Sequence, residues 1–331
     1  MSGHSLPVRK FGSFDETPTV IGLGGAVLNQ SSYSQGVATV KRALDLGVTY
    51  FDTSPGYCNN LSQPIMGEGL ANAGDDIMVA TKIGYFKNPA DYRSARAIRE
   101  QIEDNLRLLA RKRVDVLQVH EANWAAWWRD DPEGATACAT ACATADFSMD
   151  ETYNFTDSPA LTSLREAKRN GLCDYLGITG NRAAFMCHLL RNVSVDTFLL
   201  AFSYDPIIRN AETEAFNLAG QKNVTLILGA IFYGGRLTAV HPEWLDNPPE
   251  WMTPQFRRSF SKLYDIQRDT GISLVKLSVR FVLSKEQPAV ILIGASSPSE
   301  LEESVEAVKD GPLPEQIYNE IDKIGVKDPT H

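Results

Sequence analysis

The sequence of 331 residues contains no hydrophobic run long enough to cross a bilayer, which takes about 20 consecutive apolar residues. Its first residues, MSGHSLPVRKFG, also lack the apolar core of a secretory signal peptide. These two absences predict a cytoplasmic protein that makes no contact with a membrane.

Positive charge is also scarce. The chain has 32 lysine and arginine residues against 41 aspartate and glutamate residues, which gives a formal net charge of −9 at pH 7. Nucleic-acid binding depends on clustered basic side chains that neutralise phosphates. The sequence has only short basic stretches, so we expect no nucleic-acid partner.

Cysteine is infrequent, and its spacing fits neither a metal site nor a set of disulfides. The five cysteines are Cys58, Cys138, Cys142, Cys173 and Cys187. Cys138 and Cys142 are four residues apart, but no second Cys or His pair follows closely. An odd number of thiols agrees with a reducing cytosol. We therefore expect no bound metal.

The glycine-rich turn Gly-x-Gly-x-x-Gly of doubly wound dinucleotide-binding folds is missing as well. The nearest stretch, IGLGG at 21–25, is followed by the polar residues NQSS at 29–32 and not by a helical pattern. A doubly wound sheet is therefore a weak alternative.

Eight short apolar runs rich in β-branched residues are present instead, separated by amphipathic helical patterns. We expect strands at 20–22, 49–51, 78–81, 116–119, 175–178, 197–202, 225–228 and 289–293. The expected helices include 34–46, 94–109, 160–170, 182–191 and 211–222. Alternating units of this kind predict an α/β fold with parallel strands, a single (β/α)8 TIM barrel that spans 1–331 as one domain.

Two long segments interrupt this alternation. A loop insertion at about 121–158 follows the fourth strand, and its 135–145 portion, ATACATACATA, is low in complexity. The segment 234–254, rich in Pro and Trp, follows the seventh strand. Both leave carboxyl ends of strands, where barrels build their active sites. We therefore expect long loops on the C-terminal face.

Polar residues follow three successive predicted strands on this same face. Asp52, Lys82 and His120 end the second, third and fourth strands, and Tyr57 follows a Pro-Gly turn just after Asp52. A free tyrosine has a pKa near 10, and a nearby lysine ammonium is expected to lower it. Asp52 would hold Lys82 charged, and a neutral His120 would orient an oxygen atom. The cluster suits proton transfer coupled to hydride transfer.

The motifs DTSPGY, VATK and VDVLQVH, which carry these four residues, resemble the catalytic tetrad of the aldo-keto reductase superfamily. IGASS followed by LEES near the C-terminus extends the resemblance over nearly the whole chain. Within the superfamily, the GGAVLNQ turn and Trp251 resemble the sugar 1-dehydrogenase branch. The resemblance implies an NAD(P)-dependent oxidoreductase that oxidises C1 of an aldose to the lactone, with Tyr57 as general base.

The loop after the eighth predicted strand is the expected phosphate site, because backbone amides at a helix N-terminus attract anions. NADP-specific relatives usually carry Lys or Arg in this loop, whereas this chain has Glu300 where relatives often carry Arg or Gln, and a carboxylate can accept hydrogen bonds from ribose hydroxyls. We therefore expect NAD as the preferred cofactor and NADP as the second option. The residues expected to bind the cofactor are Gly25, Thr179, Gly180, Ser203, Ala230, Ile231, Gly294, Ser296, Ser297 and Glu300.

Aromatic residues on the active-face loops are candidates for a sugar-binding platform. We expect Trp124, Phe232 and Trp251 to contact substrate; Trp127, Trp128 and Tyr233 are further candidates on these loops, and Arg209 and Arg236 are weaker ones for polar contacts. The alternatives are an NADPH-dependent aldehyde or ketone reductase and a nucleotide-binding regulatory barrel with little turnover. A glycoside hydrolase would need two carboxylates, for which Asp52 and Glu121 are the candidates, and leaves Lys82 and Tyr57 without a role. We expect a small-molecule substrate and a monomer or homodimer.

Overall fold

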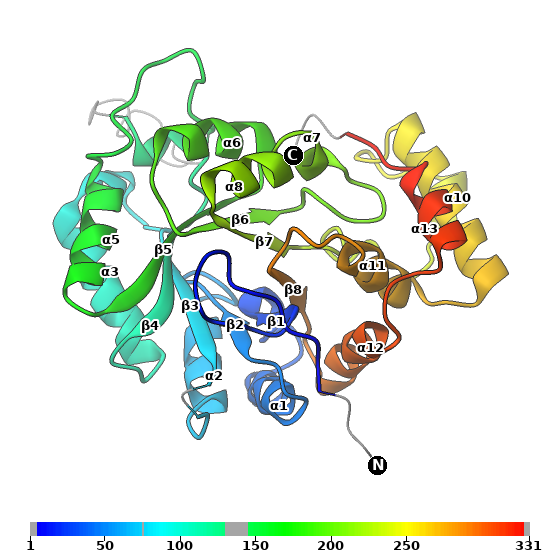
Figure 1. The fold of residues 1–331 in the computed structure, drawn as a ribbon, viewed down its shortest axis with the longest axis horizontal. Helices are drawn as coiled ribbons and strands as arrows, with labels where there is room; N and C mark the ends of the chain where they lie inside the picture. The colour runs from blue at the N-terminus through cyan, green and yellow to red at the C-terminus, as the bar shows by residue number, and fades with distance from the viewer. Residues whose placement is uncertain (1–4, 75, 130–144, 328–331) are drawn as a thin grey trace.

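The computed structural model describes residues 5–74, 76–129 and 145–327. Eight parallel strands close into a barrel in the order of the sequence (Figure 1). They are β1 (Ile21–Gly24), β2 (Tyr50–Asp52), β3 (Met78–Ile83), β4 (Val114–Val119), β5 (Cys173–Gly180), β6 (Thr197–Ala201), β7 (Thr225–Gly229) and β8 (Val290–Gly294). The predicted (β/α)8 barrel is therefore confirmed; the assignment of 1–331 to a single domain stays a prediction.

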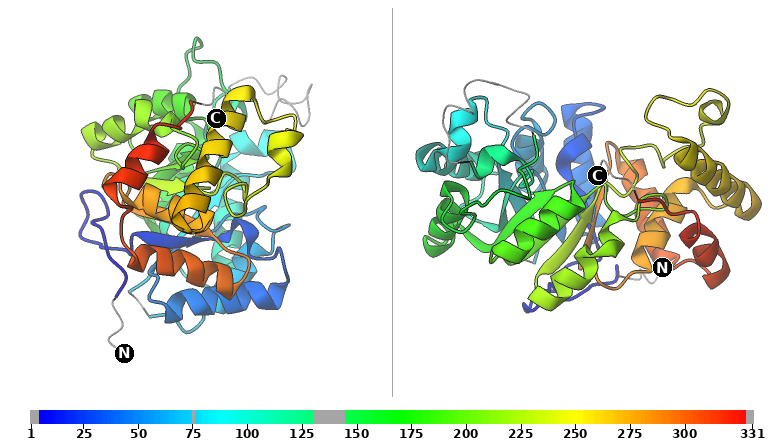
Figure 2. Two further views of the ribbon diagram at one scale, coloured as in Figure 1. Left: turned by 90° about the vertical axis from the view of Figure 1, so that its right-hand side faces the viewer. Right: turned by 90° about the horizontal axis from the view of Figure 1, so that it is seen from above.

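Helices surround the barrel and cover its outer apolar surface (Figure 2). The principal ones are α1 (Tyr33–Asp45), α2 (Ser62–Gly69), α3 (Ala95–Leu108), α5 (Pro159–Arg169), α6 (Ala183–Asn192), α8 (Ala215–Lys222), α10 (Pro254–Thr270), α11 (Leu274–Leu283), α12 (Pro298–Lys309) and α13 (Glu315–Asp322). Shorter turns are η1 (Gly25–Val27), η2 (Pro89–Arg93), η3 (Ala125–Trp127), α7 (Asn210–Thr213) and α9 (Glu243–Asp246).

Two of the predicted elements differ from the structure in a way that has a local cause. The helix expected at 211–222 is divided into α7 and α8 at Glu214, whose extended φ of −149° interrupts the helical backbone. The strand expected at 197–202 ends at Ala201, because Phe202 takes a left-handed φ of 53°. The other predicted elements agree to within about two residues at their ends.

The inside of the barrel is a separate apolar cluster that Phe11 helps to fill. It includes Tyr50, Met78 and Val116 from three neighbouring strands. Phe11 lies in the chain before β1, and its ring centroid is 5.9 Å from that of Tyr50. Because strand side chains alternate between two faces, the residues two and four positions further along these strands also point inward. The polar residues at the carboxyl ends therefore stand directly above this core.

The described ends of the 121–158 insertion are fixed to the barrel and to each other. The Trp127 indole donates a 2.8 Å hydrogen bond to the carbonyl oxygen of His120. Across the insertion, the backbone amide of Phe147 donates to the Asn123 carbonyl at 2.8 Å. The low-complexity stretch at 135–145, apart from Ala145, lies outside the described residues, as do Cys138 and Cys142.

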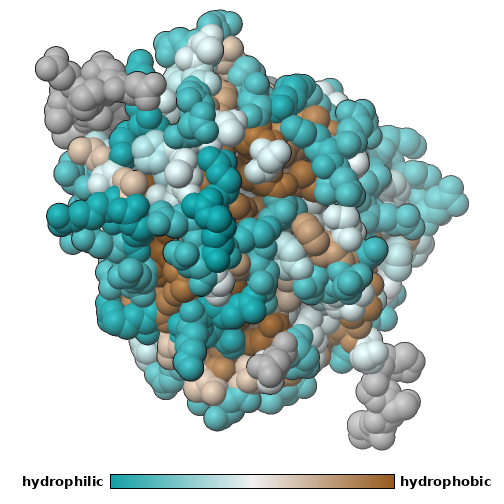
Figure 3. Space-filling view, turned by 60° about the vertical axis from the view of Figure 1, so that its left-hand side comes forward, coloured by the Kyte–Doolittle hydropathy of each residue, from teal (hydrophilic) through white to brown (hydrophobic). Residues whose placement is uncertain are grey.

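On the face shown in Figure 3, hydrophilic residues cover most of the surface and hydrophobic residues are visible mainly in the hollows between them. Within the described ranges, no helix combines the length and the apolar character that a membrane span needs. The same part of the chain holds no group of three or more His, Cys, Asp or Glu side chains that could bind a metal ion.

Candidate active site

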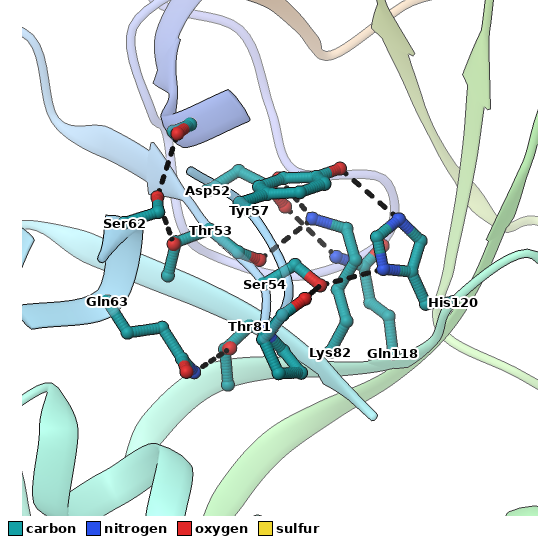
Figure 4. A network of polar contacts seen from close by, with 12 residues as sticks. Asp52, Thr53, Ser54, Tyr57, Ser62, Gln63, Thr81, Lys82, Gln118 and His120 are labelled. Carbon is teal, nitrogen blue, oxygen red and sulfur yellow. Dashed lines mark hydrogen bonds and ion pairs between the residues drawn. The ribbon is translucent and has the colours of Figure 1, made fainter. Parts of the chain in front are cut away.

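Three neighbouring strands bring Asp52, Lys82 and His120 to one end of the barrel (Figure 4). Asp52 is the last residue of β2 and lies opposite Ala80, and Lys82 in β3 lies opposite Gln118 in β4. His120 follows β4 directly. Since side chains alternate along a strand, these residues continue the inward-facing rows that begin in the apolar core. The structure therefore brings together the strand-end residues that the sequence predicts.

Asp52 and Lys82 form a buried ion pair, with side chains 3% and 1% exposed. The Lys82 ammonium donates to Asp52 and also to the Thr53 carbonyl oxygen at 2.9 Å. The second carboxylate oxygen of Asp52 accepts a 3.1 Å hydrogen bond from the Gln118 amide. Burial raises the pKa of Asp52 and lowers that of Lys82, while their mutual attraction opposes both shifts. The pair is a coupled unit that holds one ammonium at a fixed position.

Tyr57 reaches over this pair from the loop after β2. Its hydroxyl lies 3.2 Å from Nε2 of His120, and the Lys82 ammonium lies 5.0 Å from the centre of its ring. Burial, followed by the charge of Asp52, raises the pKa of Tyr57 well above 10. The net shift is therefore opposite to the one expected from Lys82 alone, because desolvation and the charge of Asp52 outweigh the effect of the ammonium.

His120 is buried and contacts residues on both of its ring nitrogens. Nδ1 lies 2.7 Å from the hydroxyl oxygen of Ser54, and Nε2 faces Tyr57. The Tyr85 ring packs edge-on against the imidazole, with centroids 4.7 Å apart. Burial, and then the Lys82 charge, lower the pKa of His120 well below 6.5. The histidine is neutral at physiological pH, in agreement with the sequence-based expectation.

The loop between β8 and α12 has a polar rim. Ser297 is the N-cap of α12 and Pro298 its first residue. The Glu300 carboxylate accepts hydrogen bonds from the Ser296 amide at 2.8 Å and from the Ser296 hydroxyl at 3.1 Å. These donors thus hold an anionic group already, in the position that the sequence predicts for a phosphate-friendly site. Glu300 itself is exposed to solvent.

Comparison with known proteins places this site in a family. The model of the aldo/keto reductase family matches residues 20–326, nearly the whole chain. The chain belongs to this family. It is therefore an NAD(P)-dependent oxidoreductase, and the resemblance that the tetrad motifs carry is confirmed at the level of the family.

Individual relatives are more distant. An L-galactose dehydrogenase of Arabidopsis thaliana is 27% identical over 92% of this chain and 89% of its own length. A D-threo-aldose 1-dehydrogenase of a Pseudomonas species is 22% identical over 85% of each chain. A solved aldo-keto reductase from Bacillus halodurans, in its holo form, superposes with a TM-score of 0.74 at 22% identity and covers 98% of this chain and 97% of its own. At this identity the superposition supports the fold alone.

Other residues that we expect to contact the cofactor of this aldo-keto reductase also have close packing partners within the protein. A Cβ atom at Gly25 would lie 2.4 Å from the Ser62 hydroxyl, and one at Gly180 would lie 2.4 Å from the Asn123 amide oxygen. Thr179, Ser203 and Ile231 are buried. Ala230 has a left-handed φ of 56°, whereas Gly294 is exposed at the rim. Packing explains the two glycines, and their cofactor contacts stay predictions.

The aromatic candidates for substrate binding separate into three groups. Trp124 is partly buried and packs on Tyr85, whose ring in turn packs on His120. Trp251 packs against Tyr233 on the loop after β7, with centroids 5.9 Å apart, and Phe232 nearby is 9% exposed. The remaining candidates of the insertion, Trp127 and Trp128, are fully buried with their indole groups bonded to backbone oxygens, so they are structural and cannot form a sugar platform.

Arg209 is also structural. Its guanidinium donates to four backbone carbonyl oxygens and is 4.2 Å from the centre of the Phe281 ring. With only 5% of the residue exposed, Arg209 is committed to fixing the chain after β6. The sequence-based suggestion that it contacts substrate is wrong. Arg236 stacks on the rings of Tyr233 and Trp251 and remains on the rim of the active face.

Sequence analysis missed three residues that contact the tetrad or lie next to it, Ser54, Gln118 and Tyr85, and considered Glu121 only as the second carboxylate of a glycoside hydrolase. Ser54 bonds His120, and Gln118 bonds Asp52. Glu121 has a left-handed φ of 46° and one carboxylate oxygen that is buried without a hydrogen-bond partner. Burial raises the pKa of Glu121 to about 7. The signal available for Gln118 is its place two residues before His120, which predicts that both point inward.

Proposed function

We propose that this aldo-keto reductase oxidises C1 of an aldopyranose to the lactone and uses NAD as hydride acceptor. The observation that carries the proposal is the 3.2 Å contact between the Tyr57 hydroxyl and Nε2 of His120, directly above the buried Lys82–Asp52 pair. A tyrosine in this position can exchange a proton with a substrate oxygen while a histidine fixes the direction of approach. No residue of the set needs to form a covalent bond with substrate.

Each side chain has a distinct part in the proposed reaction. The oxygen of Tyr57 receives the proton of the C1 hydroxyl, and His120 orients that hydroxyl by a hydrogen bond. Lys82 places positive charge 5.0 Å from the Tyr57 ring and so favours the phenolate that the oxidation requires. Asp52 holds Lys82 in place by accepting its hydrogen bond, and Gln118 in turn donates to Asp52. Bound NAD supplies the acceptor for the hydride that leaves C1.

The choice of an aldose draws on the relatives. The L-galactose dehydrogenase and the D-threo-aldose 1-dehydrogenase both match over at least 85% of this chain. The aromatic side chains of Trp124, Phe232 and Trp251 are the proposed contacts to the faces of the sugar ring. Tyr85 links Trp124 to His120 and would place this platform beside the reacting carbon.

The choice of NAD rests on the rim of the β8–α12 loop. Backbone amides at the N-terminus of α12 attract anions, which suits a dinucleotide phosphate, while the Ser296 amide and hydroxyl already bind the Glu300 carboxylate. The Glu300 carboxylate lies among the same donors and would repel the additional 2′-phosphate of NADP. We propose that Ser296, Ser297 and Glu300 contact the adenosine end of the cofactor. Gly294 has no side chain, so none occupies the space beside them.

A second candidate is NADPH-dependent reduction of an aldehyde or ketone by the same four residues. One observation favours it: the raised pKa of Tyr57 keeps its hydroxyl protonated at neutral pH, which suits a general acid. A small molecule is the partner in either case. The cytoplasmic location and the assembly as a monomer or homodimer stay predictions.

Initial rates separate these functions. Aldose oxidation predicts NADH formation from NAD and at least one aldopyranose at a higher kcat/KM than NADPH consumption with simple aldehydes. The reverse order would favour the reductase. Quenching of tryptophan fluorescence by NADH without turnover of any sugar or aldehyde would favour the regulatory barrel.

A further inference from the structure

Glu121 lies directly beside the tetrad, where the chain leaves β4. It follows His120 with a left-handed φ of 46°, a conformation that few residues other than glycine adopt. Such a backbone is costly and persists only where the surrounding structure fixes it. Two hydrogen bonds fix it here: the Ala122 amide donates to the Thr179 carbonyl at 2.8 Å, and the Trp124 amide donates to the Glu121 carbonyl at 2.9 Å. The position of Glu121 relative to His120 is therefore set by the backbone.

The side chain of Glu121 is linked to the tetrad through Tyr85. The Tyr85 hydroxyl hydrogen-bonds to the Glu121 carboxylate, and the charge of this carboxylate also acts on Tyr57. The Tyr85 ring packs edge-on against His120, with centroids 4.7 Å apart. A Cβ atom at Gly56 would lie 3.0 Å from Cγ of Tyr85, so the ring also packs on the loop that carries Tyr57. Glu121 thus lies one side chain away from both His120 and Tyr57.

The carboxylate of Glu121 is not neutralised by a close ion pair. One of its oxygens is buried and has no hydrogen-bond partner among the described residues. Two charged groups face it, Lys82 and Asp146. Lys82 is already paired with Asp52, and Asp146 is already paired with Arg182. When ionised, Glu121 therefore adds a negative charge beside a tetrad whose own two charges compensate each other.

A charge that is shielded from water acts over several ångströms with little screening. We propose that Glu121 determines the charge of the substrate: its carboxylate excludes anionic sugars and aldehydes from the space beside Tyr57 and His120 and admits neutral ones. The inference rests on the proposed function for the choice of a sugar, and it applies equally to an aldehyde in the reducing direction. Glu121 is then a specificity-determining residue that acts through space and needs no contact with the substrate.

The exclusion should depend on pH. Burial raises the pKa of Glu121 to about 7, so its charge appears as the pH rises through neutrality. His120 does not titrate there, because burial lowers its pKa well below 6.5. Burial raises the pKa of each tyrosine that faces Glu121 far above neutrality: Tyr57, Tyr85 and Tyr92. An anionic ligand favours protonated Glu121, so its affinity should fall as the pH rises through about 7, while that of a neutral ligand stays level.

Equilibrium binding with NADH in place of NAD tests the proposal without sugar oxidation. Isothermal titration calorimetry gives the Kd of each aldopyranose in a panel and of the uronate with the same ring configuration. At about pH 8 the wild type should bind the aldose at least about tenfold more tightly than the uronate. This ratio should shrink at about pH 6, where Glu121 is protonated and the uronate is still charged. Glu121→Gln should lower the ratio at the higher pH and remove its pH dependence.

Glu151→Gln is the matched control. Glu151 lies in the same insertion and also accepts a hydrogen bond from a tyrosine, Tyr153, at 2.7 Å, but it is exposed to solvent. The control should keep the wild-type ratio and its pH dependence. Succinic semialdehyde and butanal form a second pair of one anionic and one neutral ligand, and NADPH consumption measures them in the reducing direction.

The outcomes separate this inference from the proposed function. If aldoses bind better than uronates only when Glu121 is present, but NAD is not reduced, the proposed function fails and the inference stands. A uronate that binds as tightly as its aldose at about pH 8, or a ratio that is unchanged in Glu121→Gln, would overturn the inference. Absence of binding or turnover for every member of both pairs would overturn it as well. The pH dependence of the wild-type ratio decides the question even if Glu121→Gln fails to fold.

Discussion

The Lys82 ammonium and the Asp52 carboxylate meet inside the barrel, hidden almost completely from solvent. Two charges in such a place stabilise each other, but each is costly alone, because the protein interior cannot replace the lost hydration. Their attraction opposes the effects of burial on both pKa values. The pair therefore affects the stability of the fold as well as the electrostatics beneath Tyr57.

Removal of one partner should destabilise the protein much more than removal of both. We expect Lys82→Met or Asp52→Asn alone to cost about 3–5 kcal/mol, the usual range for a buried charge left unpaired. The double variant should cost clearly less than the sum of the two. Urea unfolding measures these differences, and the exposed pair Arg96–Glu100 in α3 provides a control cycle with almost no coupling. Additive effects at positions 52 and 82 would contradict the coupling.

Glu121 predicts a pH dependence of stability. Burial raises its pKa to about 7, from a usual value of 4.5. A raised folded-state pKa means that the folded protein holds the proton more tightly than the unfolded chain. Its contribution is present in full below pH 4.5 and is lost as the pH rises towards 7. Glu121→Gln, which cannot ionise, should therefore gain stability relative to wild type over this range, by about 3 kcal/mol.

Unfolding in urea at several pH values tests this expectation. The matched control is Glu100→Gln, which changes an exposed glutamate of α3 in the same way and should leave the curve parallel to that of wild type. If the stability of Glu121→Gln also ran parallel to that of wild type between about pH 5 and about pH 8, the Glu121 carboxyl would not have a raised pKa in the folded protein, and the prediction would be wrong.

The pH dependence of the rate follows from Tyr57. Its pKa lies well above 10 because of burial and the charge of Asp52. Oxidation needs the deprotonated oxygen, which is the minor form below that pKa, so kcat/KM for NADH formation should rise by nearly tenfold per pH unit through neutral and mildly alkaline pH. Carbonyl reduction uses the protonated form of Tyr57, so kcat/KM for NADPH consumption should not rise with pH. A flat profile for oxidation would show that proton transfer to Tyr57 does not limit the reaction.

Glu300 provides a test of cofactor choice. Glu300→Arg should raise the ratio of kcat/KM for NADP to that for NAD, because it replaces a repulsive charge by an attractive one. Glu300→Gln is the informative control, since its amide oxygen can still accept from Ser296 while the negative charge is gone. We expect Gln to change the ratio less than Arg. An unchanged ratio in both variants would remove Glu300 from the recognition of the 2′ position.

The strand-end residues were predictable from sequence because neighbouring parallel strands end at a common edge. Asp52, Lys82 and His120 follow three recognisable apolar runs, so the order of the strands alone places them together. Gln118 could have been added from the same reasoning, since a spacing of two from His120 keeps it on the inward face. The contact between Glu300 and the start of α12 also has a sequence signal, because Ser297 and Glu300 have the spacing of a capping box.

Other features depend on loop paths that no periodicity describes. Trp127 and Trp128 are buried because the chain after β4 curls back and bonds their indoles to backbone oxygens. The approach of Ser54 to His120 depends on the turn that follows β2. The pKa of Tyr57 could not be inferred from residue types, because its direction depends on whether desolvation or the Lys82 charge prevails.

The central claim is that Tyr57 exchanges the proton during NAD-linked oxidation of an aldose. The most direct measurement is the initial rate of NADH formation over a panel of aldopyranoses, for wild type and for Tyr57→Phe. Fluorescence quenching by NADH checks that the two proteins bind the cofactor with equal affinity. We predict turnover of at least one sugar by the wild type, and a loss of about 10²-fold or more in Tyr57→Phe, which keeps the ring but has no proton to exchange. Undiminished NADH formation by Tyr57→Phe would contradict the account.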